Sequence, residues 1–147
     1  MDQCFYKIPF DFASVLDESH GRSNMCSELD SIDQHIEMLI GTYPGEHCFD
    51  RNYGTGIWDM DFERIVSLDA WKTRFTECLS DSISKYEKRI SNCEYKLVVE
   101  DVLKENALFR NVSVRKKVDI YITATLNSTG AKCQLYYSLF LGPLSKD

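Results

Sequence analysis

Apolar residues recur at two different periods along this 147-residue chain, and the change of period separates a helical part from a part made of strands. From residue 28 to residue 40 the apolar positions are three or four apart, which predicts one face of a helix. Ser27 or Ser31 can cap its start, and Gly41 is expected at the left-handed position just beyond its end. The apolar face consists of Leu29, Ile32, Ile36, Leu39 and Ile40.

A second, longer helix is predicted from about residue 68 to residue 92. On this helix Arg89 falls at the edge of the apolar stripe and Glu87 flanks its other side, and residues two apart do not face each other. Each charge therefore needs a partner in another segment or another protein, unless Arg89 snorkels and Glu87 is solvated. The apolar stripe consists of Trp71, Phe75, Leu79, Ile83, Tyr86 and Ile90.

Beyond residue 92 the period falls to two, and Val, Ile, Tyr and Thr become frequent, as is typical of strands. Strands are predicted within residues 95–103, 112–126 and 132–141, with residues 127–130 (NSTG) as the hairpin turn between the last two. The pattern predicts an α+β fold, with two main helices packed on a small antiparallel β-sheet that has a C-terminal β-hairpin. Residues 1–26 show neither period, so we expect an N-terminal arm and loop there and a single domain over residues 27–147.

The segment between the two helices is rich in glycine. Pro44 and Gly45 are typical of a type II turn, in which glycine takes a positive φ. Asn52, Gly54 and Gly56 indicate a second reversal of the chain. These residues favour a rigid turn over a polar active-site loop.

Composition, charge and cysteine usage favour some classes of protein over others. The chain has 44% hydrophobic residues and is long enough to bury one core. Its net charge of −6 does not favour a cationic surface for nucleic acid. Six cysteines without a C-x-x-C pair, and no secretory signal, indicate reduced thiols in the cytoplasm. No apolar run reaches the roughly 20 residues of a membrane span.

Acidic side chains offer one possible catalytic chemistry. A glycosidase needs two carboxylates on either side of a sugar, and five acids lie close together in sequence. Residues 58–63 (WDMDFE), however, alternate like a strand with one solvated face, and a chain with 23 acids forms such clusters readily. The five acids are Glu46, Asp50, Asp59, Asp61 and Glu63.

Other candidate sites are weaker still. His47 and Cys48 are neighbours, and in an extended segment they would point to opposite faces, which does not suit joint metal coordination. No G-x-G-x-x-G or Walker pattern supports nucleotide binding, and no signature pairs a cysteine with a histidine. The basic run at residues 115–117 is interpreted either as charges that protect a strand from aggregation or as a contact for an acidic partner. We therefore expect no metal and no cofactor.

The order of the motifs resembles the gene 25-like family of baseplate proteins in contractile injection machines, and within it the type VI secretion members. The family pattern is roughly a helix ending in a small turn, then P-G-E, a Y/F-G pair and a later E-P-R. Lys88 stands where the family has the middle proline, which lets the helix continue, so the flanking charges need not be oriented as in the family. The resemblance covers about residues 28–141, with matches at Pro44, Gly45, Glu46, Tyr53, Gly54, Glu87 and Arg89.

This resemblance implies a structural, non-enzymatic subunit of the baseplate wedge. Its partners would be other wedge proteins, TssF and TssG in type VI nomenclature, and the contractile sheath subunits, whose polymerisation its sheet edge would template. Glu87 and Arg89 would contact partners. The protein would act in the cytoplasm within a membrane-docked baseplate, without inserting into the membrane. The family has also carried a lysozyme label, so the alternative is a peptidoglycan-cleaving hydrolase that uses Glu46 with Asp59 or Asp61.

Overall fold

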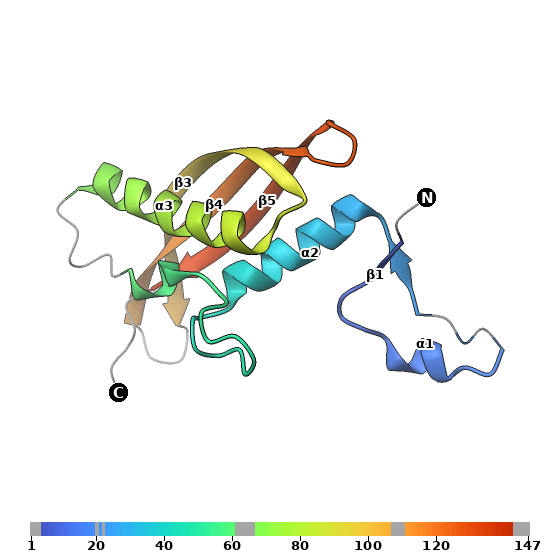
Figure 1. Cartoon of the computed structure of the whole chain (residues 1–147). Coiled ribbons are helices and arrows are strands. Elements are labelled where there is room, and N and C mark those ends of the chain that lie inside the picture. Colours follow the sequence, from blue (N-terminus) through green and yellow to red (C-terminus); the bar gives the residue numbers. More distant parts are fainter. Residues whose placement is uncertain (1–3, 20, 22, 61–66, 107–110, 143–147) are drawn as a thin grey trace.

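The structure, a computed structural model, describes residues 4–19, 21, 23–60, 67–106 and 111–142. Its α+β architecture confirms the predicted fold class, with two long helices against an antiparallel sheet whose last two strands form the C-terminal hairpin (Figure 1). The elements in chain order are β1 (Phe5–Tyr6), α1 (Phe12–Leu16), β2 (Met25–Cys26), α2 (Glu28–Gly41), the 3₁₀ helix η1 (Gly56–Asp59), α3 (Leu68–Tyr86), β3 (Ile90–Asn106), β4 (Asn111–Leu126) and β5 (Lys132–Leu141).

Helix α2 begins and ends with side-chain hydrogen bonds. Ser27 and Asp30 form a reciprocal capping box, in which the Ser27 hydroxyl accepts from the Asp30 backbone N–H over 3.1 Å. The position expected for Gly41 is wrong, because Gly41 is the last helical residue and has no positive φ. The chain leaves the helix instead through Thr42, which is extended and whose hydroxyl donates to the Met38 carbonyl over 2.6 Å.

Helix α3 ends at Tyr86, earlier than predicted. Its buried stripe is as expected up to Ile83, but Glu87 already has an extended backbone at the C-cap. Ile90 keeps the helical spacing and yet begins β3, where it pairs with Leu126. Strand pairing therefore overrides local periodicity at this point. The segment from residue 87 to residue 89 is not helical, which changes how its charged side chains meet.

The main sheet has the strand order β3-β4-β5, and both pairs are antiparallel. Leu97, Ile120 and Tyr137 lie side by side across the three strands. Alternate residues of β5 are buried and exposed, as a sheet with one covered face requires. The predicted turn at residues 127–130 joins β4 to β5.

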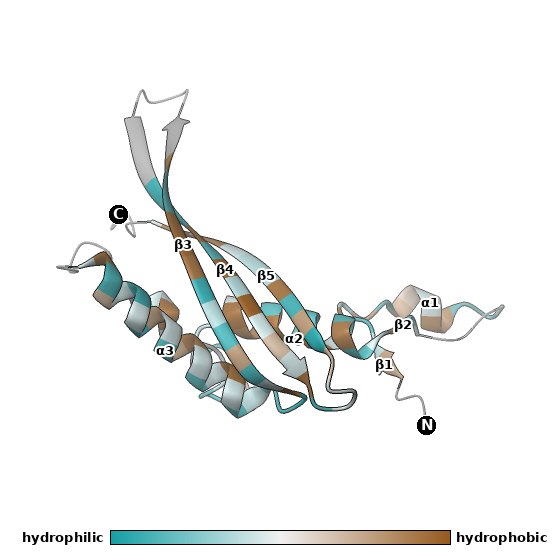
Figure 2. Ribbon diagram, turned by 90° about the horizontal axis from the view of Figure 1, so that it is seen from above, coloured by the Kyte–Doolittle hydropathy of each residue, from teal (hydrophilic) through white to brown (hydrophobic). Residues whose placement is uncertain are grey.

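Helices α2 and α3 lie on the same face of this sheet (Figures 1 and 2). Within the described ranges, no helix covers the opposite face. The core forms where the helical stripes meet the inward strand residues, and Trp71, Phe75, Ile32, Ile36 and Ile120 are among its fully buried members. Burial of this apolar area is the main force that holds the layers together.

The N-terminal residues contain more regular structure than the predicted arm and loop. Strands β1 and β2 pair antiparallel, with Phe5 opposite Cys26. Between them lies the five-residue helix α1, which has no buried residue. Figure 1 shows this segment beyond the N-terminal end of α2, away from the main sheet. Asp11 makes the short helix possible, because its side chain accepts from the backbone N–H groups of Ala13 and Ser14.

The strand-like interpretation of residues 58–63 is wrong where the structure describes them. Trp58 and Asp59 belong to the 3₁₀ helix η1, and the indole N–H of Trp58 donates to the Ile40 carbonyl over 2.9 Å. This hydrogen bond ties η1 to the end of α2, so the alternation of acids does not mark a solvated strand face. Residues 61–63 lie outside the described residues.

Candidate functional site

Glu87 and Arg89 lie where α3 passes into β3, and they form a direct ion pair. The Arg89 Nε donates to Glu87 Oε1 over 2.8 Å, and one terminal nitrogen donates to Oε2 over 2.7 Å. The prediction that residues two apart do not face each other fails here because the helix has already ended, and in extended backbone such residues share a side. The replacement of a family proline by Lys88 therefore does not prolong the helix.

Two residues of α2 complete this group. The Nδ1 of His35 lies 2.8 Å from Glu87 Oε2, and Arg89 also donates to the hydroxyl of Ser31 over 2.9 Å. The Arg89 backbone N–H donates to Glu87 Oε1 over 3.0 Å. We call Ser31, His35, Glu87 and Arg89 the Glu87 cluster. It joins the start of α2 to the junction of α3 with β3.

Glu87 is only 3% exposed, and its carboxylate accepts several hydrogen bonds. Burial opposes its ionisation, but the hydrogen bonds from Arg89 and His35 outweigh burial and lower the pKa of Glu87 to about 2. Such a carboxyl stays ionised at neutral pH and cannot act as a general acid. The contacts of Glu87 instead hold α2 to the junction of α3 with β3. Part of the Arg89 side chain remains accessible, at 28% exposure.

Sequence reasoning did not identify two members of this cluster. His35 is not singled out by any sequence pattern given above, and Ser31 is predicted only as a possible helix cap. They are four residues apart on α2 and so lie on the same helix face, which was a usable signal. The partner of that face, Glu87, is 52 residues from His35 along the chain, and spacing alone does not connect them.

The predicted turn residues shape the connection after α2. Gly45 has a φ of +103°, as the third position of a type II turn requires. Glu46 supports the same turn, because its side chain accepts from the Tyr43 backbone N–H over 2.9 Å while its own N–H donates to the Tyr43 carbonyl. Pro44, Gly45 and Glu46 therefore stabilise the backbone of the same turn.

At Gly54 the second reversal of the chain packs closely against the first. The φ of Gly54 is +122°, and a β-carbon at this position would lie 2.4 Å from the Thr42 carbonyl oxygen. The preceding Tyr53 is buried, and its ring packs against Tyr86 and His35, with centroids 5.0 and 6.1 Å away. The turn is thereby connected to the Glu87 cluster through His35.

The two carboxylates proposed for hydrolysis that the structure describes, Glu46 and Asp59, do not form an enclosed site. Glu46 and Asp59 are both exposed, and both hold Tyr43, since the Tyr43 hydroxyl donates to Asp59 over 2.5 Å. Asp61 lies outside the described residues. Glu46 and Asp59 thus each accept a hydrogen bond from Tyr43.

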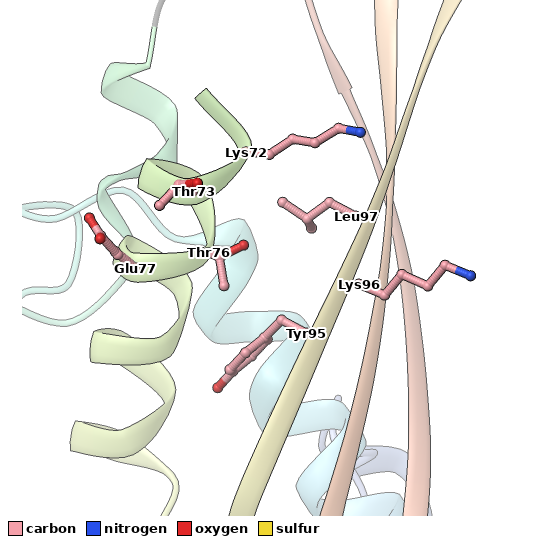
Figure 3. A pocket seen from close by; sticks show the side chains of 7 residues that line it. All are labelled: Lys72, Thr73, Thr76, Glu77, Tyr95, Lys96 and Leu97. Atoms are coloured by element: carbon pink, nitrogen blue, oxygen red, sulfur yellow. The ribbon is translucent and has the colours of Figure 1, made fainter. Parts of the chain in front are cut away.

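A hollow of about 450 Å³ lies elsewhere, between α3 and β3 (Figure 3). Among the described residues that line it, Glu77 is the single carboxylate, and none is a histidine or a cysteine. A glycosidase needs two carboxylates across the scissile bond, and the described lining residues supply one. The residues that line the hollow are Lys72, Thr73, Thr76, Glu77, Tyr95, Lys96 and Leu97.

The main sheet leaves backbone groups available at its borders. Strands β3 and β5 are its outer strands, and in the part of the chain described here neither pairs with a further strand on its outer side. The face away from the helices carries the exposed rings of Tyr121 and Tyr136, whose centroids are 5.1 Å apart. On that face Lys117 lies within β4 and pairs with Asp119 over 2.9 Å.

Two further findings concern metals and membranes. Among residues 4–19, 21, 23–60, 67–106 and 111–142, no group of three or more His, Cys, Asp or Glu side chains could hold a metal ion. None of the described helices combines the length and the apolar character needed to cross a bilayer.

Comparison with known proteins finds a matching family model and matching solved structures. The sequence model of the family described as baseplate wedge protein gp25 matches residues 26–131. A solved structure from Geobacter sulfurreducens, described provisionally as a tail lysozyme, has the same fold, with a TM-score of 0.60 and 18% identity. The match covers 84% of this chain and 100% of that one. No curated protein matches the sequence significantly.

Proposed function

The chain belongs to the family of baseplate wedge protein gp25, and from that premise we propose that it is a structural subunit of a type VI secretion baseplate, similar to TssE. In this role it binds wedge proteins of the TssF and TssG kind and templates the first ring of contractile sheath subunits. It works in the cytoplasm, within a baseplate docked to a membrane.

The observation that carries this proposal is the pair of borders of the main sheet along which no strand of the described residues pairs. An outer strand presents N–H and C=O groups that a strand from another chain can complete. Strand β5 is the better candidate for this border, because its pairing with β4 is regular from Lys132 to Leu141, whereas the register of β3 shifts between Ser91 and Glu94. A sheath strand that pairs along β5 would extend the sheet by one strand.

A nucleation assay tests the templating role. Purified sheath subunits are followed by light scattering with and without the wedge complex that contains this chain. We expect the complete complex to shorten the lag before sheath growth, and the complex without this chain to leave the lag unchanged. Equal lag times in the two samples would contradict the role.

The wedge contact is proposed at Arg89, with Glu87 as the residue that positions it. Arg89 retains an accessible part of its guanidinium side chain, whereas Glu87 is enclosed. Arg89→Ala is expected to weaken binding to the wedge proteins, and Arg89→Lys to restore it only in part, because lysine cannot make the same forked contacts. Wild-type binding by Arg89→Ala would show that the contact lies elsewhere.

A peptidoglycan hydrolase is the second candidate, and the description of the Geobacter structure favours it. That reaction would use Glu46 with Asp59 or Asp61. A digestion assay with purified protein and isolated cell walls separates the two functions. Turnover that Glu46→Gln abolishes would replace the assembly role with an enzymatic one, whereas the assembly role predicts no turnover by either protein.

A further inference from the structure

The N-terminal segment exposes an unusual amount of apolar surface for its length. Phe12 is 70% exposed and Leu16 is 80% exposed, both on α1. Exposed apolar groups gathered on one segment are typical of a surface that another protein covers. The other large apolar side chains exposed in residues 4–19 are Tyr6, Ile8, Phe10 and Val15.

Contacts between neighbouring rings hold this apolar surface together. The rings of Tyr6 and Phe10 meet edge-on with centroids 6.3 Å apart, and those of Phe10 and Phe12 are 4.9 Å apart. These aromatic pairs keep the rings side by side while their outer faces stay in solvent. The segment therefore presents a continuous patch.

The segment is also fixed to the body of the protein, beside the Glu87 cluster. The guanidinium of Arg89 lies 5.2 Å from the centre of the Phe5 ring, and the backbone N–H of Ile8 donates to the side chain of Gln34 on α2 over 2.8 Å. The ion pair that holds Arg89 thus also orients the start of the segment. Through Phe5, the segment begins next to Arg89, the residue proposed above for wedge binding.

Charge indicates what covers the patch. Residues 4–19 carry three acids, Asp11, Asp17 and Glu18, against the single base Lys7. An anionic lipid surface would repel this segment, and a second copy of a chain with a net charge of −6 is a poor electrostatic match. An apolar groove with a basic rim on a different protein is complementary in both respects.

We propose that residues 4–19 form a docking arm that inserts its aromatic and aliphatic patch into an apolar groove with a basic rim on a neighbouring protein subunit. The arm lies outside residues 26–131, which the family model matches, so the family supplies no role for it. The proposal rests on the proposed function, because the neighbouring subunit is another protein of the baseplate wedge.

Titration of the full chain into the purified TssF–TssG-like wedge complex tests the arm. Phe12→Ala/Leu16→Ala is expected to lower the affinity about 30-fold or more, as loss of two anchor residues does. The matched control Phe49→Ala/Leu68→Ala removes one exposed phenylalanine and one exposed leucine from outside the arm and is expected to bind like the wild type. Equal loss of affinity in both double variants would contradict a specific arm.

A charge variant tests the basic rim. Asp17→Lys/Glu18→Lys is expected to weaken binding, with a deficit that grows as the salt concentration falls, since salt screens exposed charges. An affinity that the reversal leaves unchanged or improves at low salt would overturn the basic rim. Arm-dependent self-association in the ultracentrifuge, or arm-dependent flotation with anionic vesicles, would replace the protein groove with a second copy or a membrane.

The outcomes separate this proposal from the function on which it rests. If the wild type binds the wedge complex and Phe12→Ala/Leu16→Ala binds equally well, the arm proposal alone fails. If the wild type does not bind the wedge complex at all, the proposed function fails, and the arm proposal fails with it.

Discussion

The body of the protein and its N-terminal arm use the same residue types in opposite ways. Helix α3 places Phe75 and Leu79 in the core with no exposed surface, whereas α1 leaves Phe12 and Leu16 mostly exposed to solvent. In the body, the apolar stripe of each helix has a sheet to pack on. Helix α1 of the arm has no buried residue, and no described helix or sheet packs beneath it; the contacts of the arm to the body involve Phe5 and Ile8 at its start.

This difference separates two roles along one chain. The helices and the main sheet bury their own apolar surface, so the body has the features of a unit that can fold without a partner. The arm keeps its apolar surface for another molecule. The Glu87 cluster lies between the two regions, since it closes the junction of α3 with β3 and places Arg89 against Phe5.

The largest expected effect contrasts the two regions directly. Phe75→Ala should lower the free energy of unfolding by about 3–5 kcal/mol, because it leaves a cavity in the core. Phe12→Ala should change it by less than about 0.5 kcal/mol, as an exposed substitution does. Urea titrations followed by circular dichroism measure both. A similar large loss in Phe12→Ala would mean that the arm packs into the body in solution.

The second effect concerns pH and the cluster between the regions. The pKa of Glu87 is about 2 in the folded protein and ordinarily 4.5. Its contribution to stability, about 3 kcal/mol by linkage, is therefore present above pH 4.5 and lost as the pH falls from there towards 2. Glu87→Gln should be less stable than the wild type at pH 7, and the difference should shrink as the pH falls. A constant difference between pH 7 and pH 3 would contradict this.

The third effect compares two glycines within the body. Gly54→Ala should cost about 2 kcal/mol, because the new methyl group would press on the Thr42 carbonyl and the positive φ disfavours a side chain. Gly45→Ala is the matched control. It also has a positive φ but no atom within 4 Å of the added carbon, so its cost should be about 1 kcal/mol. Equal decreases in melting temperature in the two variants would show that the close approach of Gly54 to the Thr42 carbonyl adds nothing to the cost.

The smallest effect on stability is expected for the arm itself. Phe12→Ala/Leu16→Ala should leave the urea midpoint almost unchanged, since both side chains are mostly exposed. The same variant should lose affinity for the wedge complex. If the variant lost both stability and binding, Phe12 and Leu16 would pack into the body in solution. The contrast between the two regions would then not hold.

Periodicity predicted the body well because its helices and strands each have one buried face. Ile36 on α2 and Phe75 on α3 were placed on apolar faces by their spacing, and both are buried. Ile90 was wrongly predicted to be helical, because it continues the helical stripe while its partner in the structure is Leu126 of β4. A pairing between distant strands leaves no trace in the local spacing of one segment.

The Glu87 cluster shows the corresponding limit for a site. The need for partners at Glu87 and Arg89 was visible in the sequence, but their identity depended on where α3 ends. Once the helix stops at Tyr86, the two residues reach each other, and the neighbouring helix supplies His35. The arm was expected to be irregular because its apolar residues follow neither period. Exposed apolar residues do not have to line up on one buried face, so their spacing need not follow the period of a helix or a strand.

Amide hydrogen exchange along β5 tests the central claim most directly. Successive amides of an outer strand point alternately towards the neighbouring strand and away from it. In the free protein the inward amides that bond β4 should be protected and the outward amides should exchange rapidly. After addition of purified sheath subunits to the assembled wedge, we predict that the outward amides become protected at every second residue of β5. Sheath binding that leaves every outward amide of β5 as exposed as before would contradict the account.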